Sequence, residues 1–306
     1  MSTTLSRRGF VIGGLAAGVL TACGTSGGGT AEPRPQLVSL FSSDRVITAG
    51  LPQRIPFAVV DAGGLLLGDT DEVEVVILAD GDVVTTTSVR GRVVDHDHTA
   101  AKADTDHQHA DLLRYYALRA ELPKPGIYDL EVDFGSGGVG RLPVQAFDRS
   151  EVALPLPGDP LPPVVTPTLE RPEGISPLCT RSPEPCSFHQ HDVAEVIGTG
   201  PLALLVATPA LCFTAYCGPV LDTLIELAPD FAGVTFVHLE VYANAADVDG
   251  NYADPALELA RPVRELGLAF EPSLFLVDTS GTVVDRIDNV FDRSEAHDAL
   301  AALATP

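Results

Sequence analysis

The first half of the chain alternates between short apolar runs and turn residues. Between about residues 37 and 148 six such runs occur: Leu37–Phe41, Ile55–Val60, Val73–Leu78, Tyr115–Leu122, Ile127–Val132 and Leu142–Phe147. Apolar and polar residues alternate within the third and fifth runs, and a period of two is typical of half-buried strands. An all-β domain is therefore expected over residues 37–150.

Strands of this number and spacing favour an immunoglobulin-like sandwich. No nucleophile or general base stands out among these residues. We therefore expect this domain to be a spacer or an interaction module, and its fold alone does not distinguish between these two roles.

One segment of this domain, residues 95–111, is rich in histidine and aspartate. It holds four of the eight histidines of the chain, in two His-x-His pairs: His96, His98, His107 and His109. Residues i and i+2 of an extended segment point the same way, so each pair could offer two imidazoles to Cu, Zn or Ni. A polar insertion without fixed geometry explains the same composition, and both interpretations stay open.

Residues 151–306 show a different pattern. Seven prolines between Glu151 and Gly174 disfavour regular hydrogen-bonded ladders and predict an interdomain linker at residues 151–175. The remaining residues, 176–306, predict strands and helices in this order: strand 202–207, helix 219–228, strand 234–241, a helix ending near 266, strands 273–277 and 283–287, and helix 294–303. Strand, helix and strand in succession require a parallel pair with a crossover helix, so this domain is expected to be α/β.

The N-terminal residues predict an export signal rather than part of a folded domain. Arg7 and Arg8 precede an apolar run, Val11–Ala22, that is shorter than the roughly 20 residues of a membrane-spanning helix. Ser6-Arg7-Arg8-Gly9-Phe10 resembles a twin-arginine signal. The resemblance implies a cleaved signal peptide at residues 1–22.

Cys23 ends the sequence Leu20-Thr21-Ala22-Cys23, which resembles the lipobox of bacterial lipoproteins. The resemblance implies a lipid on Cys23, a flexible tether over residues 23–36 and attachment to the extracytoplasmic face of the cell membrane. The 306 residues include 19 Lys and Arg against 42 Asp and Glu, a formal net charge of −23. This negative charge excludes nucleic acid as a default partner. It also repels anionic lipid headgroups, so attachment to a membrane would depend on acyl chains rather than on a basic patch.

Two motifs of the C-terminal domain resemble the thioredoxin superfamily. Tyr216-Cys217-Gly218-Pro219-Val220 is similar to the signature in which an aromatic residue precedes Cys-Gly-Pro-Cys, with Val220 in the place of the second cysteine. Residues 266–277 are similar to the segment that leads into the cis-proline of the family, which would be Pro272. The resemblance covers about residues 195–306. It implies a thioredoxin-like fold with Pro272 beside a redox cysteine.

Physical arguments also favour a reactive Cys217. Pro219 suits the first turn of a helix, so Cys217 is expected at a helix start, where free N–H groups stabilise a thiolate and lower its pKa. Cys212 precedes it by five residues in a segment that Pro219 keeps out of a helix, and such a loop can bring two Cα atoms within the roughly 4.4–6.8 Å of a disulfide. We expect Cys217 to be the attacking thiolate and Cys212 its resolving partner.

Two features depart from the thioredoxin pattern. The strand at 202–207 lacks the buried carboxylate with which thioredoxins move a proton to the buried cysteine, and the spacing of the two cysteines differs. A stable disulfide in a non-catalytic domain is therefore an alternative. Cys-x4-Cys after Thr208-Pro209 is also similar to one class of peroxiredoxins, in which Cys212 would form a sulfenate. Copper-delivering thioredoxin folds use two cysteines and a distant histidine, for which His238 is conceivable.

Cys179 and Cys186 flank a second proline-rich loop, with His189 and His191 close behind. These soft or borderline ligands could hold zinc. In an exported protein, however, two cysteines around such a loop are more often a structural bridge. We therefore expect a Cys179–Cys186 disulfide.

These patterns predict a membrane-anchored thiol–disulfide oxidoreductase with Cys212, Cys217 and Pro272 in its site. Its partners would be exported proteins that carry thiols or disulfides, and no organic cofactor is implied. A non-catalytic interaction lipoprotein, a Cu- or Zn-handling lipoprotein and a peroxidase stay open as alternatives.

Overall fold

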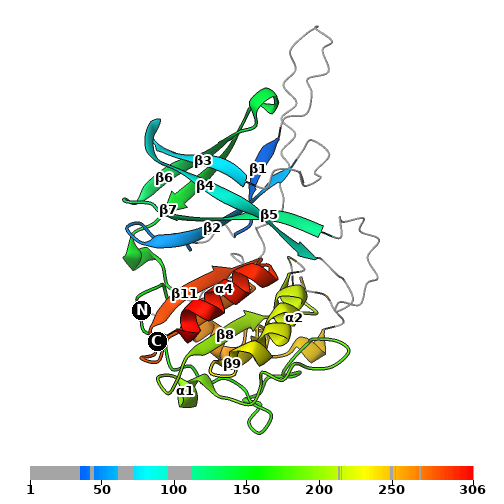
Figure 1. Cartoon of the computed structure of the whole chain (residues 1–306). Helices are drawn as coiled ribbons and strands as arrows, with labels where there is room; N and C mark the ends of the chain where they lie inside the picture. Colours follow the sequence, from blue (N-terminus) through cyan, green and yellow to red (C-terminus); the bar gives the residue numbers. More distant parts are fainter. Residues whose placement is uncertain are drawn as a thin grey trace.

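The computed structural model describes residues 35–41, 45–60, 72–95, 112–212, 214, 216–248, 251, 253–268 and 270–305. They form a β-domain and an α/β domain that pack against each other (Figure 1). The predicted signal peptide, Cys23, most of the predicted tether and the four histidines of the His-rich segment lie outside these ranges. No helix within the described ranges has both the length and the apolar character needed to cross a bilayer.

The β-domain consists of one seven-stranded sheet. Its strands are β1 (Gln36–Ser39), β2 (Pro52–Val60), β3 (Glu72–Ala79), β4 (Asp82–Asp95), β5 (Leu112–Glu121), β6 (Gly126–Asp133) and β7 (Val139–Ala146). All pairs are antiparallel in the order β1-β2-β5-β4-β3-β6-β7, and the two outer strands β1 and β7 also lie in contact, so the sheet is barrel-like. Alternate residues such as Val73, Val75 and Ile77 fill its interior.

Strand β4 explains why the sheet is continuous. Residues 82–90 pair with β3, and residues 91–95 pair with β5. One long strand therefore serves both halves, where a sandwich would have two separate sheets. The predicted all-β character is confirmed, whereas the immunoglobulin-like arrangement is not confirmed. The sequence pattern missed β4 because the run Thr85–Thr87 is polar and mostly exposed.

The α/β domain has the order of elements expected from the sequence. Its strands are β8 (Leu202–Ala207), β9 (Thr235–Glu240), β10 (Ser273–Val277) and β11 (Val283–Asp288), and its helices are α1 (Val193–Val196), α2 (Cys217–Leu227), α3 (Arg261–Glu265) and α4 (Arg293–Ala304). The sheet order is β11-β10-β8-β9, with β8 and β9 parallel and the other pairs antiparallel. This is the strand–helix–strand unit followed by a hairpin and a helix that the thioredoxin resemblance implies.

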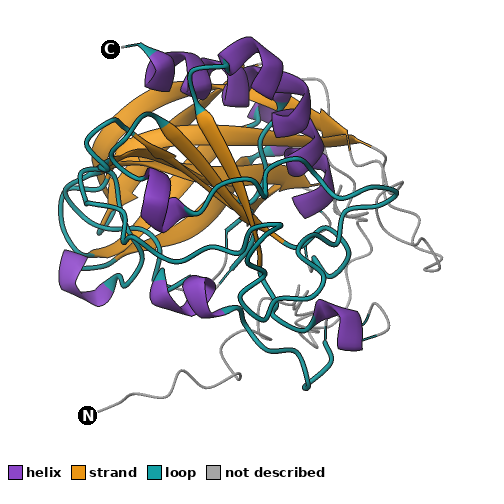
Figure 2. Ribbon diagram, turned by 90° about the horizontal axis from the view of Figure 1, so that it is seen from below, coloured by secondary structure: helices purple, strands orange, loops and turns teal. Residues whose placement is uncertain are grey.

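Both faces of the small sheet are covered. Ala203, Leu205 and Ala207 of β8 point toward α2 and α4, whose apolar stripes form one core with them. Leu202, Leu204 and Val206 point to the other face and belong to a core shared with the β-domain. Seen from below, helices and loops surround the strands (Figure 2). Burial on both faces explains why β8 is apolar throughout rather than alternating.

The segment predicted as a linker, residues 151–175, is instead part of the folded molecule. As predicted, it forms no regular strand, but its apolar side chains, among them Leu154, Leu156, Leu161 and Val164, are buried in the shared core. Proline excludes a regular ladder without excluding the burial of leucine and valine between the prolines.

Both edges of the small sheet contact other segments of the chain. At β11, Gly158 N donates to Val283 O, and Val283 N donates to Asp159 O, each over 2.8 Å. At β9, His238 N donates to Phe188 O over 3.0 Å. These bonds fix the segments before the sheet in sequence along its two sides.

A buried ion pair joins the two domains. Arg54 of β2 binds Glu295 of α4 through two nitrogens, at 2.7 and 2.9 Å, and the two side chains are only 2% and 6% exposed. Arg54 also donates to the carbonyls of Asp288 and Val290, and the Tyr115 hydroxyl donates to Glu295 over 2.7 Å. Each charge thus has several partners, as a buried pair requires.

Candidate functional site

Cys212 and Cys217 form a disulfide at the start of α2, with their Cα atoms 5.9 Å apart. Cys217 is the first residue of the helix, and Pro219 lies in its first turn, where a missing N–H is tolerated. Cys212 lies in the preceding loop, as expected from that proline. The structure therefore brings the two cysteines of the predicted redox pair together.

The two sulfurs differ in access. Cys217 is fully buried, at 0% exposure, whereas Cys212 is partly exposed. The backbone N–H of Cys217 donates to Cys212 Sγ over 3.3 Å, and Thr214 Oγ1 lies 3.4 Å from the same sulfur. A thiolate at Cys212 would therefore be stabilised by a hydrogen bond from the N–H at the start of α2, because that group points at Cys212 Sγ. Cys212 is therefore the accessible sulfur, whereas the sequence led us to expect an attacking thiolate at Cys217.

Pro272 follows a cis peptide bond, as the resemblance implies, and Glu271 on its N-terminal side reaches the disulfide. A carboxylate oxygen of Glu271 and the two sulfurs all lie within 4.8 Å of one another, and Glu271 is buried. A buried carboxylate thus lies beside the two sulfurs, although β8 carries none. Sequence reasoning missed Glu271, although its place next to the expected cis-proline was a usable signal.

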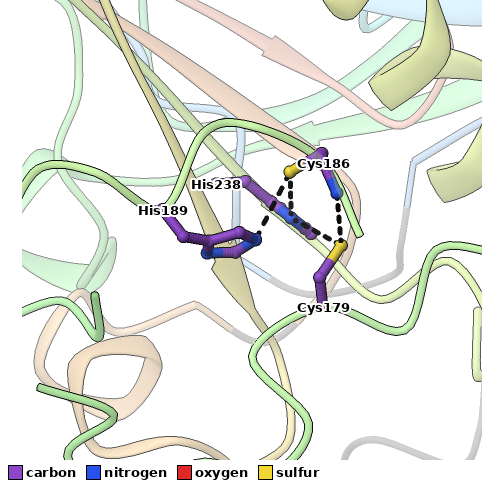
Figure 3. Close-up of side chains that lie close together, drawn as sticks. All are labelled: Cys179, Cys186, His189 and His238. Carbon is purple, nitrogen blue, oxygen red and sulfur yellow. Dashed lines mark hydrogen bonds between the residues drawn. The ribbon is translucent and has the colours of Figure 1, made fainter. Parts of the chain in front are cut away.

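Cys179 and Cys186 are free thiols, so the predicted disulfide between them is absent. Both are buried and face the imidazoles of His189 and His238 (Figure 3). Cys179 Sγ lies 3.6 Å and Cys186 Sγ 3.4 Å from His238 Nδ1, and Cys186 Sγ lies 3.3 Å from His189 Nε2. We name these four residues the Cys–His cluster. The two free sulfurs and one ring nitrogen of each histidine thus lie together, all within 4.8 Å of one another.

Neighbouring hydrogen bonds hold the loop that carries the cluster. The backbone N–H and the hydroxyl of Thr180 donate to Glu240 Oε2 over 2.9 and 3.0 Å, and the same hydroxyl accepts from Ala210 N over 3.1 Å. Arg181 Nε donates to Asp222 of α2 over 2.6 Å. The loop is thereby attached to β9, to α2 and to the loop that precedes Cys212.

The electrostatics of the cluster favour one thiolate. A hydrogen bond from Cys186 lowers the pKa of Cys179 despite burial, and the two histidines add to this effect. The pKa of Cys186 is raised, first by its hydrogen bond to Cys179 and then by burial. Burial lowers the pKa of His189. Burial also raises the pKa of the adjacent Glu240 to about 7.

The histidines considered from the sequence lie in different places. His238 belongs to the Cys–His cluster and not to the group formed by Cys212, Cys217 and Glu271, so it does not serve the expected copper arrangement with that pair. His191, two residues beyond His189, is not one of the four clustered residues. The candidate metal ligands His96, His98, His107 and His109 lie outside the described residues. His238 was not identifiable as a partner of Cys179 because only the fold brings β9 against residues 179–189.

Comparisons with known proteins add little. No family model and no curated protein matches the chain. Among solved structures, the peroxidoxin BcpB from Mycobacterium tuberculosis is 19% identical, over 37% of this chain and 84% of that one, with a TM-score of 0.24. A CARDB domain of a Pyrococcus furiosus protein, solved in complex with di-metal ions, is 10% identical over 40% of this chain and 95% of that one, with a TM-score of 0.19. At these values neither similarity bears on function.

Proposed function

We propose that the protein is a thiol–disulfide oxidoreductase of thioredoxin-like type. The observation that carries this proposal is the Cys212–Cys217 disulfide at the start of α2, with the carboxylate of Glu271, the residue before the cis-Pro272, beside the two sulfurs. A partly exposed sulfur next to a buried one, with a helix N–H aimed at the exposed atom, suits reversible exchange with an outside thiol.

Exchange on the oxidised pair begins at Cys212. A substrate thiolate attacks Cys212 Sγ, the Cys212–Cys217 bond breaks, and Cys217 leaves as a thiolate that takes up a proton. A second substrate thiolate then attacks the substrate sulfur of the mixed disulfide and releases Cys212. Two electrons pass from the substrate dithiol to the cysteine pair. The reverse sequence reduces a substrate disulfide, and the relative reduction potentials set the direction.

Glu271 would handle the proton of Cys217. Cys217 is buried, so its thiol has no direct exchange with bulk water, and the Glu271 carboxylate is the acid–base group that lies beside both sulfurs among the described residues. In the reducing direction it accepts the proton that Cys217 must lose before attacking Cys212. In the oxidising direction it returns that proton.

The proposal includes export and anchoring. The N-terminal motifs that resemble a twin-arginine signal and a lipobox support a lipid on Cys23, an extracytoplasmic location and exported thiol proteins as substrates. Replacing Cys23→Ser should move the protein from the membrane fraction to the soluble fraction of cells that express the full chain. Unchanged fractionation would contradict the lipid anchor without touching the redox proposal.

A redox titration tests the enzyme function. The full chain is equilibrated in glutathione buffers of graded ratio, free thiols are alkylated, and the state of Cys212 and Cys217 is read from peptide masses. We expect a midpoint above about −300 mV and catalysed exchange with a disulfide-bonded test protein. A midpoint below about −300 mV without exchange would establish a structural bridge in a non-catalytic domain. Oxidation of Cys212 to a sulfenate by peroxide, without thiol exchange, would favour the peroxidase instead.

A further inference from the structure

We propose that Cys179, Cys186, His189 and His238 bind one Zn²⁺ ion as a structural site. Two thiol sulfurs and two imidazole nitrogens form one of the usual donor sets of structural zinc, and their ligand atoms lie within 4.8 Å of one another. This site is separate from the redox pair, so the proposal goes beyond the proposed function and does not depend on it.

The distances between the donor atoms fit a tetrahedron around zinc. With Zn–S bonds of about 2.3 Å and Zn–N bonds of about 2.0–2.1 Å, a tetrahedral site separates sulfur and nitrogen by about 3.6 Å. Three of the four sulfur–nitrogen distances in the cluster are 3.3, 3.4 and 3.6 Å, and the fourth, between Cys179 and His189, is below 4.8 Å. An ion therefore fits among these side chains with little movement of their donor atoms.

The imidazoles are oriented as metal ligands are. His238 Nε2 lies 3.0 Å from the carbonyl oxygen of Ala207, which can only accept, so Nε2 carries the proton and Nδ1 faces the sulfurs. A ring nitrogen that donates to a backbone carbonyl while the other meets the metal is the usual arrangement around ligating histidines. His189 presents Nε2 to Cys186, while its buried Nδ1 has no hydrogen-bond partner among the described residues.

Charge and burial explain the preference for a divalent ion. All four residues are buried, and two buried thiolates without a counter-ion would be costly. Zn²⁺ neutralises two thiolates and leaves the site without net charge. Four protein ligands also fill a tetrahedral shell, so the site has no open position for substrate and stabilises rather than catalyses.

The site would fasten the loop of residues 179–189 to the edge of the small sheet. Three ligands come from this loop, and His238 comes from β9. Residues 179–189 form no regular helix or strand, so few backbone hydrogen bonds hold this loop. A metal ion would link its two ends to a strand.

Metal analysis of the unmodified full chain gives the first test. Purified in reductant and dialysed against trace Zn²⁺, it should hold about one zinc per chain. Replacing Zn²⁺ with Co²⁺ should give the visible absorption of a tetrahedral ion and a thiolate-to-cobalt band in the near ultraviolet. X-ray absorption at the zinc edge should resolve two sulfur and two nitrogen neighbours.

Variants assign the ion to these residues. Cys186→Ser and His238→Gln should lose the bound zinc and the cobalt spectrum. Matched controls, Cys212→Ser for the cysteine and His191→Gln for the histidine, should keep both. The His-rich segment offers imidazoles of its own. The measurements are therefore repeated in a variant that combines His96→Asn, His98→Asn, His107→Asn and His109→Asn, which should keep the sulfur-bound ion.

The inference is overturned by either of two results. One is a reduced, unmodified chain that takes up no Zn²⁺ or Co²⁺ with sulfur neighbours. The other is a Cys179–Cys186 disulfide that forms in the native protein even when Zn²⁺ is present in excess. Wild-type spectra decide these cases even if a cluster variant does not fold. Loss of zinc with intact exchange at Cys212, or the reverse, separates this proposal from the proposed function.

Discussion

Cys212 and Cys217 are the same chemical group in two different surroundings. Cys212 is partly exposed and receives an N–H from the helix start, whereas Cys217 is enclosed by the core that α2 and α4 form with β8. The sequence placed both cysteines near a helix start, but which of them reaches solvent depends on packing that no local pattern contains. The roles that we propose for them therefore follow from burial rather than from position in the motif.

Trapping of mixed disulfides tests these roles. Cys217→Ser leaves the accessible Cys212 thiol and should accumulate a mixed disulfide with oxidised glutathione. Cys212→Ser leaves a thiol that reacts only after local opening, so its modification should be slower by at least about tenfold, equivalent to an opening free energy of about 1.4 kcal/mol. Mass spectrometry over time measures both rates. Faster modification of Cys217 would restore the roles expected from the sequence.

Glu271 has a second residue-scale consequence. Glu271→Gln keeps the size of the side chain but removes its ability to accept a proton from Cys217. The rate of exchange should fall by between about tenfold and a hundredfold. Stopped-flow reduction of a disulfide substrate measures it, with the exposed Glu258→Gln as the control. Equal rates in the two variants would show that Glu271 takes no part in the proton transfer.

At the scale of elements, the strands and helices of the α/β domain were predictable and the connecting segments were not. Strands β8 and β10 are fully buried and, apart from Ser273, apolar, because both faces of their sheet are covered. Such apolar runs between turn residues are clear in a sequence. Strand β4 and the core contacts of residues 151–175 lacked that signal. The consecutive threonines of β4 and the frequent prolines of residues 151–175 both resemble loop sequences when the segments that pack against them are unknown.

The candidate site divides in the same way. Short local motifs predict Cys212, Cys217 and Pro272, because the residues that identify each of them are its neighbours in the sequence. The pairing of Cys179 and Cys186 with His238 is not predictable from spacing, since β9 lies about fifty residues away and only the parallel sheet brings it to the loop.

Leu156 tests whether the proline-rich segment is structural. Its side chain is 0% exposed in the shared core, so Leu156→Ala should lower the free energy of unfolding by about 2–5 kcal/mol. Leu169 of the same segment is 62% exposed, and Leu169→Ala should change that free energy by no more than about 0.5 kcal/mol. Urea unfolding followed by circular dichroism measures both. A linker without core contacts would give two equal, small effects.

At the scale of the whole molecule, an ion pair and apolar contacts both cross the boundary between the two domains and hold them together. Around the Arg54–Glu295 pair, Ala58, Val94 and Tyr115 of the β-domain pack with Val290 of the α/β domain. Tyr216, which lies between Cys212 and Cys217, contacts this patch as well. The β-domain therefore borders the loop of the redox cysteines.

The ion pair makes this assembly sensitive to acid. Burial alone would raise the pKa of Glu295, but the charge and hydrogen bonds of Arg54 outweigh it and hold the pKa below its ordinary value. The stabilisation is therefore complete above the unfolded pKa of about 4.3 and is lost as the pH falls through the lower folded value. Urea midpoints measured from neutral pH downward should fall in this acidic range.

Glu295→Gln isolates that contribution. The variant should lose about 3–5 kcal/mol at neutral pH, because Arg54 is left buried without its counter-charge, and its urea midpoint should fall less steeply with acid than that of the unmodified chain. Glu226→Gln is the control, since Glu226 pairs with Arg293 at the surface and should have little effect. Parallel acid profiles for the two variants would contradict a stabilising role for the buried pair.

The small sheet also has a consequence for association between molecules. Residues 158–159 form backbone hydrogen bonds with β11, and Phe188 forms one with β9. Backbone groups at both edges of the sheet, where a strand of another molecule would pair, are therefore already bonded within the chain. These bonds leave fewer unpaired backbone groups for a strand of another molecule, so the small sheet is less able to associate with a second sheet through its edges.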